Sequence, residues 1–391
     1  MIVEPLGVAS ASDAPASDLE PLWDRWADVT DGRLAVRLLW HRQNGFQPYW
    51  DLLFREKGED SLPWLWPPSA HPFLSTDFID KCKLEEQVVA RRLLEFRETA
   101  PATLSEDVTD EDFALAWSAI RSRCFGTEVR RARIDGQMGV VSASFALGIV
   151  GCVASGAPTI FVQCLAAGIV LAAGLWLWRV QVQGQSEVAL MPWVDLVNHS
   201  GRAPSVSAFM AFDAFKERFC FSNVQSTPAG QELFVSYGPK GNDILIRYYS
   251  FVENDNPHDY VDIPLGSTAC TEVLTVEVRQ QLEQLLGRPC LRFQRDGEIA
   301  AEDGLDSRIY TMAEERFEQA GLSCAQVSSI LASFASGHPF GESEDADRKM
   351  LMAAKGLTAE KVELLTAWRS EKRRVLKEAV SKWCVPDGQS P

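Results

Sequence analysis

Two segments decide the fold of this chain: MPWVDLVNHS at residues 191–200 and GQELFVSYGPKGN at residues 230–242. Between them, Phe209–Val224 is rich in apolar and β-prone residues, a pattern that predicts strands. The first segment ends in the pair Asn198-His199, and the second carries Tyr237 on a turn that contains glycine. Polar side chains at the ends of apolar strands are common in binding and catalytic sites. We therefore expect these two segments to form the functional site.

The composition is that of a globular protein of 391 residues, with 46% hydrophobic and 24% charged residues. This length predicts two or three domains with a sizeable core. The formal net charge of −16 argues against a nucleic-acid surface and suits basic partners such as lysine-bearing proteins. The nine cysteines are scattered, without a CxxC pair or a Cys/His cluster, which predicts reduced thiols and no metal site. The N-terminus shows no signal peptide.

The N-terminal region is predicted to be mainly helical after a flexible leader over residues 1–30, because its first twenty residues are mostly small and acidic. The aromatic stretches at residues 46–50 and 62–68 contain proline and are predicted to be irregular chain anchored in the core. Thr109 begins a capping-box-like sequence with acidic residues in the first helical turn. The predicted helices of this region cover Arg33–Asn44, residues 76–96 and residues 109–125.

Residues 256–385 are predicted to form a separate helical domain, with one strand at 261–265 near its start. The predicted helices are 276–286, which ends at Gly287, 310–320, and a long helix that begins near Leu357. This last helix has an apolar face and a basic run at residues 369–377 on the other face. We expect the basic run to be solvated rather than functional.

A stretch without any charged residue interrupts the chain from Gly136 to Trp178. Its halves, 138–157 and 159–178, are each close to the ~20 residues that cross a bilayer core, and arginines flank both ends. We favour a membrane hairpin with both ends on the cytosolic side, because a soluble helix of this length normally keeps a polar face. Two alternatives stay open: a pair of buried helices in a soluble protein, and a translated non-coding stretch.

Four motifs point to a family by their order and spacing. They are Arg121-Ser122-Arg123, Pro192-x-x-Asp195-x-x-Asn198-His199-Ser200, Gly230-x-Glu232-Leu233-Phe234-x-Ser236-Tyr237-Gly238, and Asn242 followed by Tyr249-Ser250-Phe251-Val252. With them, the chain resembles the SET-domain protein methyltransferases, of the class like the Rubisco large-subunit lysine methyltransferase. The resemblance covers about residues 30–380. It implies an α+β fold in which a SET-domain β-fold with a pseudoknot spans residues 31–255. That domain would contain a helical insert at about 33–125 and the apolar insertion at 136–179, and an all-α substrate-binding domain would follow it.

The resemblance also implies roles for individual residues. Tyr237 and Tyr249 match tyrosines of the methyl-transfer channel and are the expected catalytic residues. Methyl transfer from a sulfonium needs a neutral amine held in line with the methyl group, and tyrosine hydroxyls and carbonyls can orient both. No metal is expected. The residues expected to bind S-adenosylmethionine are Arg123, Asp195, Asn198, His199 and Tyr249.

The sequence departs from the family near its N-terminus. The family begins with a Gly-x-Gly strand-turn that wraps the cofactor, whereas Met1–Ala9 offers a single glycine. The favoured function is an S-adenosylmethionine-dependent protein-lysine N-methyltransferase, with histidine methylation as a competing outcome. The alternative is a non-catalytic SET-like protein-binding module. The expected partner is a protein that presents lysine or histidine, without nucleic acid. The expected location is a membrane, through residues 138–178 with the SET domain facing the cytosol, or otherwise the cytoplasm or an organelle.

Overall fold

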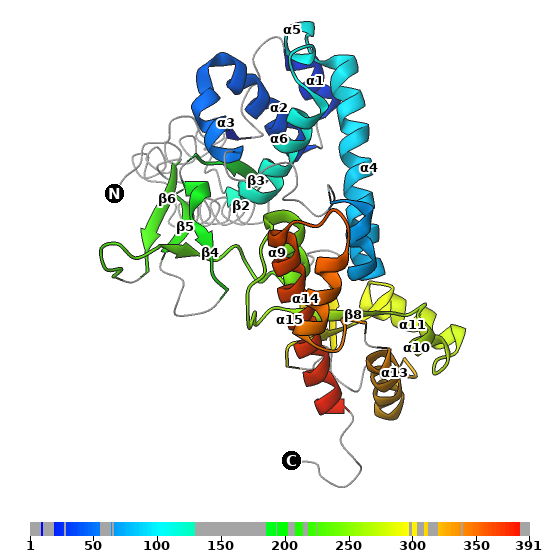
Figure 1. The fold of residues 1–391 in the computed structure, drawn as a ribbon. Helices are drawn as coiled ribbons and strands as arrows, with labels where there is room; N and C mark the ends of the chain where they lie inside the picture. The colour runs from blue at the N-terminus through cyan, green and yellow to red at the C-terminus, as the bar shows by residue number, and fades with distance from the viewer. Residues whose placement is uncertain are drawn as a thin grey trace, which may run out of the picture.

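The chain folds into a mixed helix and sheet structure, shown as a computed structural model in Figure 1. The apolar insertion predicted at residues 136–179 lies outside the described residues. Among the helices that are described, none is both long and apolar enough to cross a membrane. The structure describes residues 9–10, 19–26, 29–54, 64, 66–129, 185–192, 194–201, 208–213, 218–224, 226–296, 299–302, 309–311, 320–337 and 339–383.

Most helices of the N-terminal third pack around a shared core, at the top of the molecule in Figure 1, whereas Ala70, Phe78 and Cys82 belong to the C-terminal core. Fully buried side chains of Trp26, Leu34, Phe96 and Phe113 form the centre of the shared core. The helices are α1 (Glu20–Arg25), α2 (Thr30–His41), the π-helical turn η2 (Arg42–Phe46), α3 (Gln47–Phe54), the 3-10 helix η5 (Pro68–Phe73), α4 (Thr76–Thr99), α5 (Ala102–Ser105) and α6 (Asp110–Arg123).

The start of α6 confirms the capping box that the sequence predicts. The Thr109 hydroxyl accepts a hydrogen bond from the Asp112 N–H, and the Asp112 carboxylate accepts one from the Thr109 N–H. Each bond satisfies a backbone donor that the first turn of a helix leaves unpaired. The last turn of α6 carries Arg121 and Arg123.

Two predictions for the N-terminal region are wrong. Residues 19–26 are not part of a flexible leader, because α1 buries Leu22 and Trp23 in the helical core. Residues 46–50 are not irregular either, because α3 begins at Gln47. Pro48 is the second residue of that helix, and the π-helical turn Arg42–Phe46 stands directly before it. The predicted anchoring of this stretch in the core is confirmed by the burial of Tyr49 and Trp50.

Short strands follow α6. The antiparallel sheet β1-β3-β2 joins Ala9–Ser10, Gln185–Leu190 and Cys124–Val129. The strands predicted within residues 209–224 are confirmed as the antiparallel pair β5 (Ala208–Asp213) and β6 (Arg218–Asn223). The last pair is parallel and joins β4 (Asn198–His199) to β7 (Phe234–Val235).

The C-terminal region is helical, but it is not the predicted all-α domain. It contains a four-stranded antiparallel sheet in the order β11-β10-β9-β8. The strand predicted at 261–265 is confirmed as β8, whereas the segment predicted to begin a helix at Tyr310 is strand β11. The elements are α9 (Asn242–Tyr249), β8 (Tyr260–Pro264), α10 (Thr268–Thr271), α11 (Val276–Leu286), β9 (Cys290–Gln294), β10 (Ile299–Glu302), β11 (Ile309–Thr311), α13 (Cys324–Ser336), α14 (Glu344–Ala353) and α15 (Ala359–Trp383).

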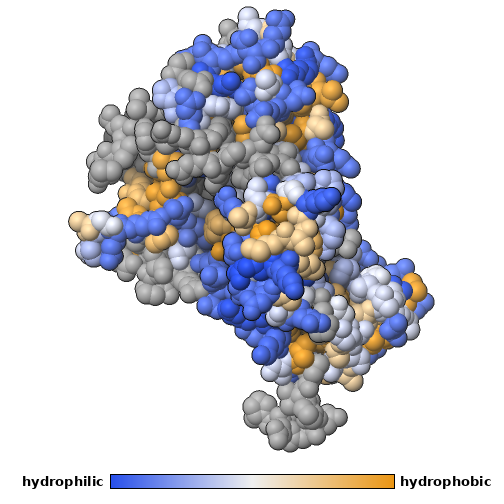
Figure 2. Space-filling model, in the orientation of Figure 1, coloured by the Kyte–Doolittle hydropathy of each residue, from blue (hydrophilic) through white to orange (hydrophobic). Residues whose placement is uncertain are grey.

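The basic run on α15 is not the solvated face that the sequence predicts. Arg369 and Lys372 are 5% and 1% exposed, and Glu371 between them is 2% exposed. Arg369 pairs with Asp347 of α14, so that charge is compensated inside the molecule. The face in Figure 2 is mostly hydrophilic with scattered apolar patches, while the large apolar clusters lie inside.

Candidate functional site

The candidate site forms where β4 and β7 pair in parallel. Asn198 lies opposite Phe234, and His199 lies opposite Val235. The N–H of Ser200 extends this ladder by donating to the carbonyl of Val235 at 3.0 Å. The pairing therefore brings the end of the first sequence segment beside the tyrosine turn of the second segment.

Tyr237 is one of four rings that contact one another in a closed cycle, which we call the aromatic cluster: His199, Tyr237, Tyr249 and Phe251. The Tyr237 ring centroid lies 5.0 Å from that of His199 and 4.9 Å from that of Tyr249. The Phe251 ring lies 6.0 Å from His199 and 6.3 Å from Tyr249. Gly238 follows Tyr237 with a φ of +97°, a backbone conformation that L side chains rarely adopt. The turn that presents Tyr237 to the cluster thus depends on glycine.

Two hydrogen bonds fix the orientation of Tyr237. Its backbone N–H donates to Nδ1 of His199 at 3.0 Å, and its hydroxyl donates to the carbonyl of Val197 at 2.7 Å. Because Nδ1 accepts, the neutral His199 ring carries its proton on Nε2. The His199 side chain therefore holds the tyrosine backbone, while the Val197 carbonyl holds the tyrosine hydroxyl.

Burial controls the protonation of the cluster. It raises the pKa of Tyr237 to about 12, although nearby Arg123 opposes the shift. It also raises the pKa of Tyr249 and lowers the pKa of His199. Both tyrosines are consequently neutral hydroxyl groups at physiological pH, and His199 is favoured in its neutral form. Such groups orient a reactant by hydrogen bonds rather than by removing its proton.

Asp195 and Arg123 form a second group beside the cluster. Nη1 of Arg123 lies 3.5 Å from Oδ2 of Asp195 and donates to the Asp195 carbonyl at 3.3 Å. The Tyr49 hydroxyl donates to the same carboxylate oxygen at 2.7 Å, and burial together with Asp195 raises the pKa of Tyr49. These contacts anchor the chain two residues before Val197, whose carbonyl holds Tyr237.

Asn198 differs from the other predicted residues because its side chain is exposed. Its amide donates to the Glu232 carboxylate on the second segment. The predicted residues thus lie in three places. His199, Tyr237 and Tyr249 belong to the aromatic cluster, and Arg123 pairs with Asp195 beside it. The side chain of Asn198 is exposed.

Comparison with solved structures decides the fold. No family model matches the chain. A structure of the SET domain of LSMT bound to methyllysine and AdoHcy has a TM-score of 0.52, covering 94% of this chain and 77% of that chain at 12% identity. A structure of Rubisco LSMT bound to AdoMet has the same TM-score at 13% identity and covers 96% of this chain and 79% of that chain. The chain has the SET-domain fold.

Sequence relatives of this SET-domain chain match it over shorter stretches. SET domain-containing protein 4 of Artemia parthenogenetica is 32% identical over 87 residues, 22% of this chain and 21% of the relative. Its counterpart in Mus musculus is 36% identical over 75 residues, 19% of this chain and 16% of the relative. The actin-histidine N-methyltransferase of Drosophila melanogaster is 29% identical over 97 residues, 25% of this chain and 17% of the relative. The matches therefore span about a fifth, or less, of these curated relatives.

Sequence reasoning missed two residues that support the SET site. Glu253 lies with Oε2 3.5 Å from Nε2 of His199, and its Oε1 accepts a hydrogen bond from the Gly201 N–H at 2.8 Å. Tyr49 was assigned only to core packing, although its hydroxyl bonds to Asp195. Both residues adjoin recognised motifs, since Glu253 follows Val252 directly and Tyr49 belongs to an aromatic stretch. Their partners are far away in sequence, so spacing alone does not reveal the contacts.

The donor set of the site fits a sulfonium cofactor. Aromatic faces attract cations, and the Tyr237 ring, whose hydroxyl is held on the Val197 carbonyl, lies between the rings of His199 and Tyr249 at about 5 Å from each. Neutral hydroxyls and backbone carbonyls can contact a methyl-bearing cation without reacting with it. Within the described parts of the chain, no group of three or more His, Cys, Asp or Glu side chains is placed to hold a metal ion.

Proposed function

We propose that the chain is an S-adenosylmethionine-dependent protein-lysine N-methyltransferase. The observation that carries the proposal is the aromatic cluster within a SET fold, with the Tyr237 hydroxyl held on the Val197 carbonyl. In this proposal the two paired segments belong to the pseudoknot of the family. Arg123, Asp195 and the 198–199 strand would hold the cofactor, with Tyr237 and Tyr249 facing the transferred methyl group.

The residues of the chain would act by positioning and electrostatics. S-adenosylmethionine supplies a methyl group on a sulfonium, which leaves as a neutral thioether when the amine nitrogen bonds to the methyl carbon. The Tyr237 hydroxyl donates a hydrogen bond to the Val197 carbonyl, so its oxygen lone pairs stay available to accept a hydrogen bond from the incoming amine. The rings of Tyr237 and Tyr249 attract the positive charge that passes from sulfur to nitrogen. The amine must arrive neutral, and its extra proton is released to water after transfer.

Two other functions remain as alternatives. Histidine is the competing target, because one relative is an actin-histidine N-methyltransferase. A non-catalytic protein-binding module is the second alternative, because the Gly-x-Gly element is missing from the sequence. The short strand Ala9–Ser10 pairs with β3 at Leu190 and Ala189, next to the first site segment. A strand therefore lies beside the first site segment, although Met1–Ala9 offers a single glycine.

Binding of the cofactor is tested first, by calorimetric titration of the full chain with S-adenosylmethionine. We expect saturable binding by the wild type and weaker binding by Arg123→Met. Arg121→Met is the matched control on the same helix, because Arg121 contacts Asp31 and Tyr248 rather than Asp195. If the well-folded wild type binds no S-adenosylmethionine, the proposed methyltransferase activity is rejected and the protein-binding module becomes the favoured function.

The target side chain is tested by incubation with labelled S-adenosylmethionine and a lysate of the host. Labelled proteins are then digested, and mass spectrometry assigns the modified residue. Methyl-lysine is the expected product. Label found on histidine alone would replace lysine by the competing target without changing the proposed reaction.

A membrane location through residues 138–178 is a separate proposal that rests on the absence of charge in that stretch. Fractionation of cells that express a reporter fusion tests it. Recovery of the fusion entirely in the soluble fraction without detergent would reject a membrane hairpin.

A further inference from the structure

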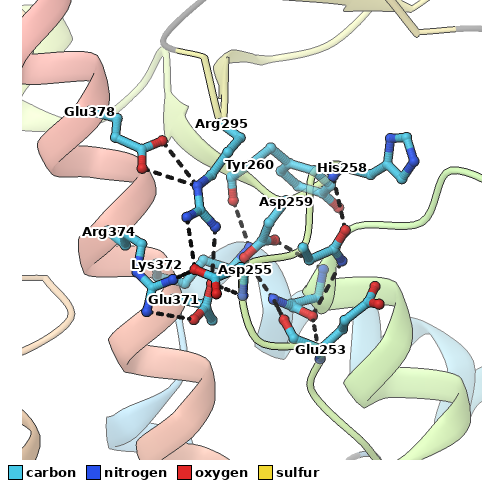
Figure 3. A network of polar contacts seen from close by, with 12 residues as sticks. Glu253, Asp255, His258, Asp259, Tyr260, Arg295, Glu371, Lys372, Arg374 and Glu378 are labelled. Carbon is cyan, nitrogen blue, oxygen red and sulfur yellow. Dashed lines mark hydrogen bonds and ion pairs between the residues drawn. The ribbon is translucent and has the colours of Figure 1, made fainter. Parts of the chain in front are cut away.

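A network of charged side chains joins the C-terminal helix α15 to the loop that follows the SET site. Figure 3 shows Glu371, Lys372, Arg374 and Glu378 on α15 among Arg295, Asp255 and Asp259. Arg295 contacts Asp255, Glu371 and Glu378 within 3.0 to 3.3 Å. Most of this network ties the C-terminal elements together. One branch of it leads toward the aromatic cluster.

That branch begins at Asp259, which is 0% exposed. Nζ of Lys372 donates to Oδ1 of Asp259 at 2.8 Å. Asn242 donates twice to the same carboxylate, through its backbone N–H to Oδ1 at 2.9 Å and through its side-chain amide to Oδ2 at 2.9 Å. Asp259 is therefore clamped by a buried cation on one side. On its other side it fixes the first residue of α9, the helix that ends at Tyr249.

The branch continues from Asn242 to Tyr237. The Asn242 amide oxygen accepts from the Glu253 N–H at 2.9 Å, and its amide nitrogen donates to the Glu253 carbonyl at 3.1 Å. The Glu253 carboxylate faces His199, with Oε2 3.5 Å from Nε2, and Nδ1 of the same ring accepts the Tyr237 N–H. The hydrogen bonds, together with the 3.5 Å contact between Oε2 of Glu253 and the neutral His199 ring, thus form one chain from Asp259 through Asn242, Glu253 and His199 to Tyr237, which we call the relay.

We propose that Asp259 is a positioning residue for methyl transfer, which acts through the relay on the orientation of Tyr237. This inference rests on the proposed function. Asp259 itself touches neither the aromatic cluster nor the groups expected at the reaction. Its effect is to fix both oxygens toward Asn242, so that the Asn242 amide presents the correct edge to Glu253.

Lys372 bonds to two buried acids, Asp259 and Asp243, so a substitution at Asp243 is a matched control for one at Asp259. Lys372 lies 2.8 Å from Asp259 and 2.9 Å from Asp243. Asp243 also accepts a hydrogen bond from Nε1 of Trp368 at 2.8 Å, but it gives no bond to the Asn242 side chain. Removing either acid leaves Lys372 with one carboxylate partner. Asp259→Asn and Asp243→Asn therefore make the same chemical change on the same lysine, and only Asp259→Asn touches the relay.

Asp259→Asn has a defined local consequence. An amide keeps one oxygen acceptor, which can serve Lys372 and the Asn242 N–H. Its NH₂ group then faces the Asn242 NH₂ group, and two donors cannot bond to each other. Asn242 must rotate or lose a bond, and the misplacement passes to Glu253 and His199. Asp243→Asn keeps an oxygen acceptor for both Trp368 and Lys372.

The test compares both variants with the full-length wild type. We expect Asp259→Asn to lower kcat roughly ten- to a hundredfold, the cost of a misplacement of about 1 Å, with little change in the KM for S-adenosylmethionine. We also expect it to move the NMR signal and titration midpoint of His199, recorded without cofactor. Asp243→Asn should leave kcat and the His199 signal close to the wild type, and thermal melting checks that both variants fold.

Three results would overturn the proposal: an unchanged kcat in folded Asp259→Asn, a lowered kcat with an unchanged His199 signal, or equal losses in both variants. The last result would mean general loosening around Lys372. If the wild type transfers no methyl group to any protein, the proposed function fails and Asp259 has no transfer to position. The His199 signal then still shows whether the relay exists, so the two failures are distinguishable.

Discussion

Tyr237→Phe removes a single hydroxyl group and leaves the aromatic ring in its cluster. The lost bond to the Val197 carbonyl, 2.7 Å long, contributes about 0.5–1.5 kcal/mol to stability, so the variant should stay folded. Its effect on rate should be larger, because the hydroxyl would orient the amine in the transition state. Loss of one preorganised hydrogen-bonding group of this kind costs about 10²–10³ in kcat.

The assay for Tyr237→Phe measures initial rates with labelled S-adenosylmethionine, alongside urea unfolding of each variant. Tyr248→Phe is the control, since the Tyr248 hydroxyl bonds to Arg121 at 2.8 Å, outside the aromatic cluster. It should lose comparable stability and keep its rate. Because the pKa of Tyr237 is about 12, this hydroxyl should add no basic limb to the pH profile below pH 10 or so. A Tyr237→Phe rate close to that of the wild type would refute its catalytic role.

Three further predictions concern stability. Trp26→Ala should cost about 3–5 kcal/mol in the free energy of unfolding, because Trp26 is fully buried in the helical core. A loss below 1 kcal/mol or so, measured by urea titration, would mean that residues 19–26 are part of a flexible leader after all. Lys372→Met should cost about 3–5 kcal/mol, since it leaves two buried acids without their cation, whereas exposed Lys377→Met should be nearly neutral. Burial lowers the pKa of His199 below its ordinary 6.5, so the unfolded chain binds a proton more readily. The stability from neutral His199 is complete above pH 6.5 and falls as the pH drops through 6.5 toward the lowered folded value. Unfolding of the wild type and His199→Gln from pH 7.5 to 5 should show this difference, and parallel curves would contradict it.

The sequence predicts helix starts and ends correctly where they depend on residues that are close by in the chain. The capping box at Thr109 predicts the start of α6, and Gly287 in the left-handed conformation ends α11 where the pattern ends. The basic run of α15 was misjudged for the opposite reason. A helical pattern shows which face is apolar, but it does not show that Asp243, Asp259 and Asp347 elsewhere in the chain compensate charges on the polar face.

The sequence likewise predicts the residues of the site that lie in motifs, but not those that depend on distant partners. Tyr237 and His199 lie in recognisable motifs, and parallel pairing of β4 with β7 brings them together. Glu253 and Tyr49 gain their roles only from partners across the fold, such as Asp195, which lies 146 residues after Tyr49. The sheet β8–β11 was hidden for a related reason. Its strands have three to five residues, too short for alternation to stand out from neighbouring helices.

The clamp by Lys372 also has a consequence for biosynthesis. A chain emerges from the ribosome from its N-terminus onward, and Lys372 follows Asp259 by 113 residues. Until α15 has been made and docked, Asp243 and Asp259 lack their buried cation, so the loop that begins α9 is not yet held closed around them. The motifs assigned to methyl transfer are translated early, yet the proposed site is completed late. We therefore expect ribosome-bound chains halted before α15 to be silent, although every residue of the aromatic cluster has already been made.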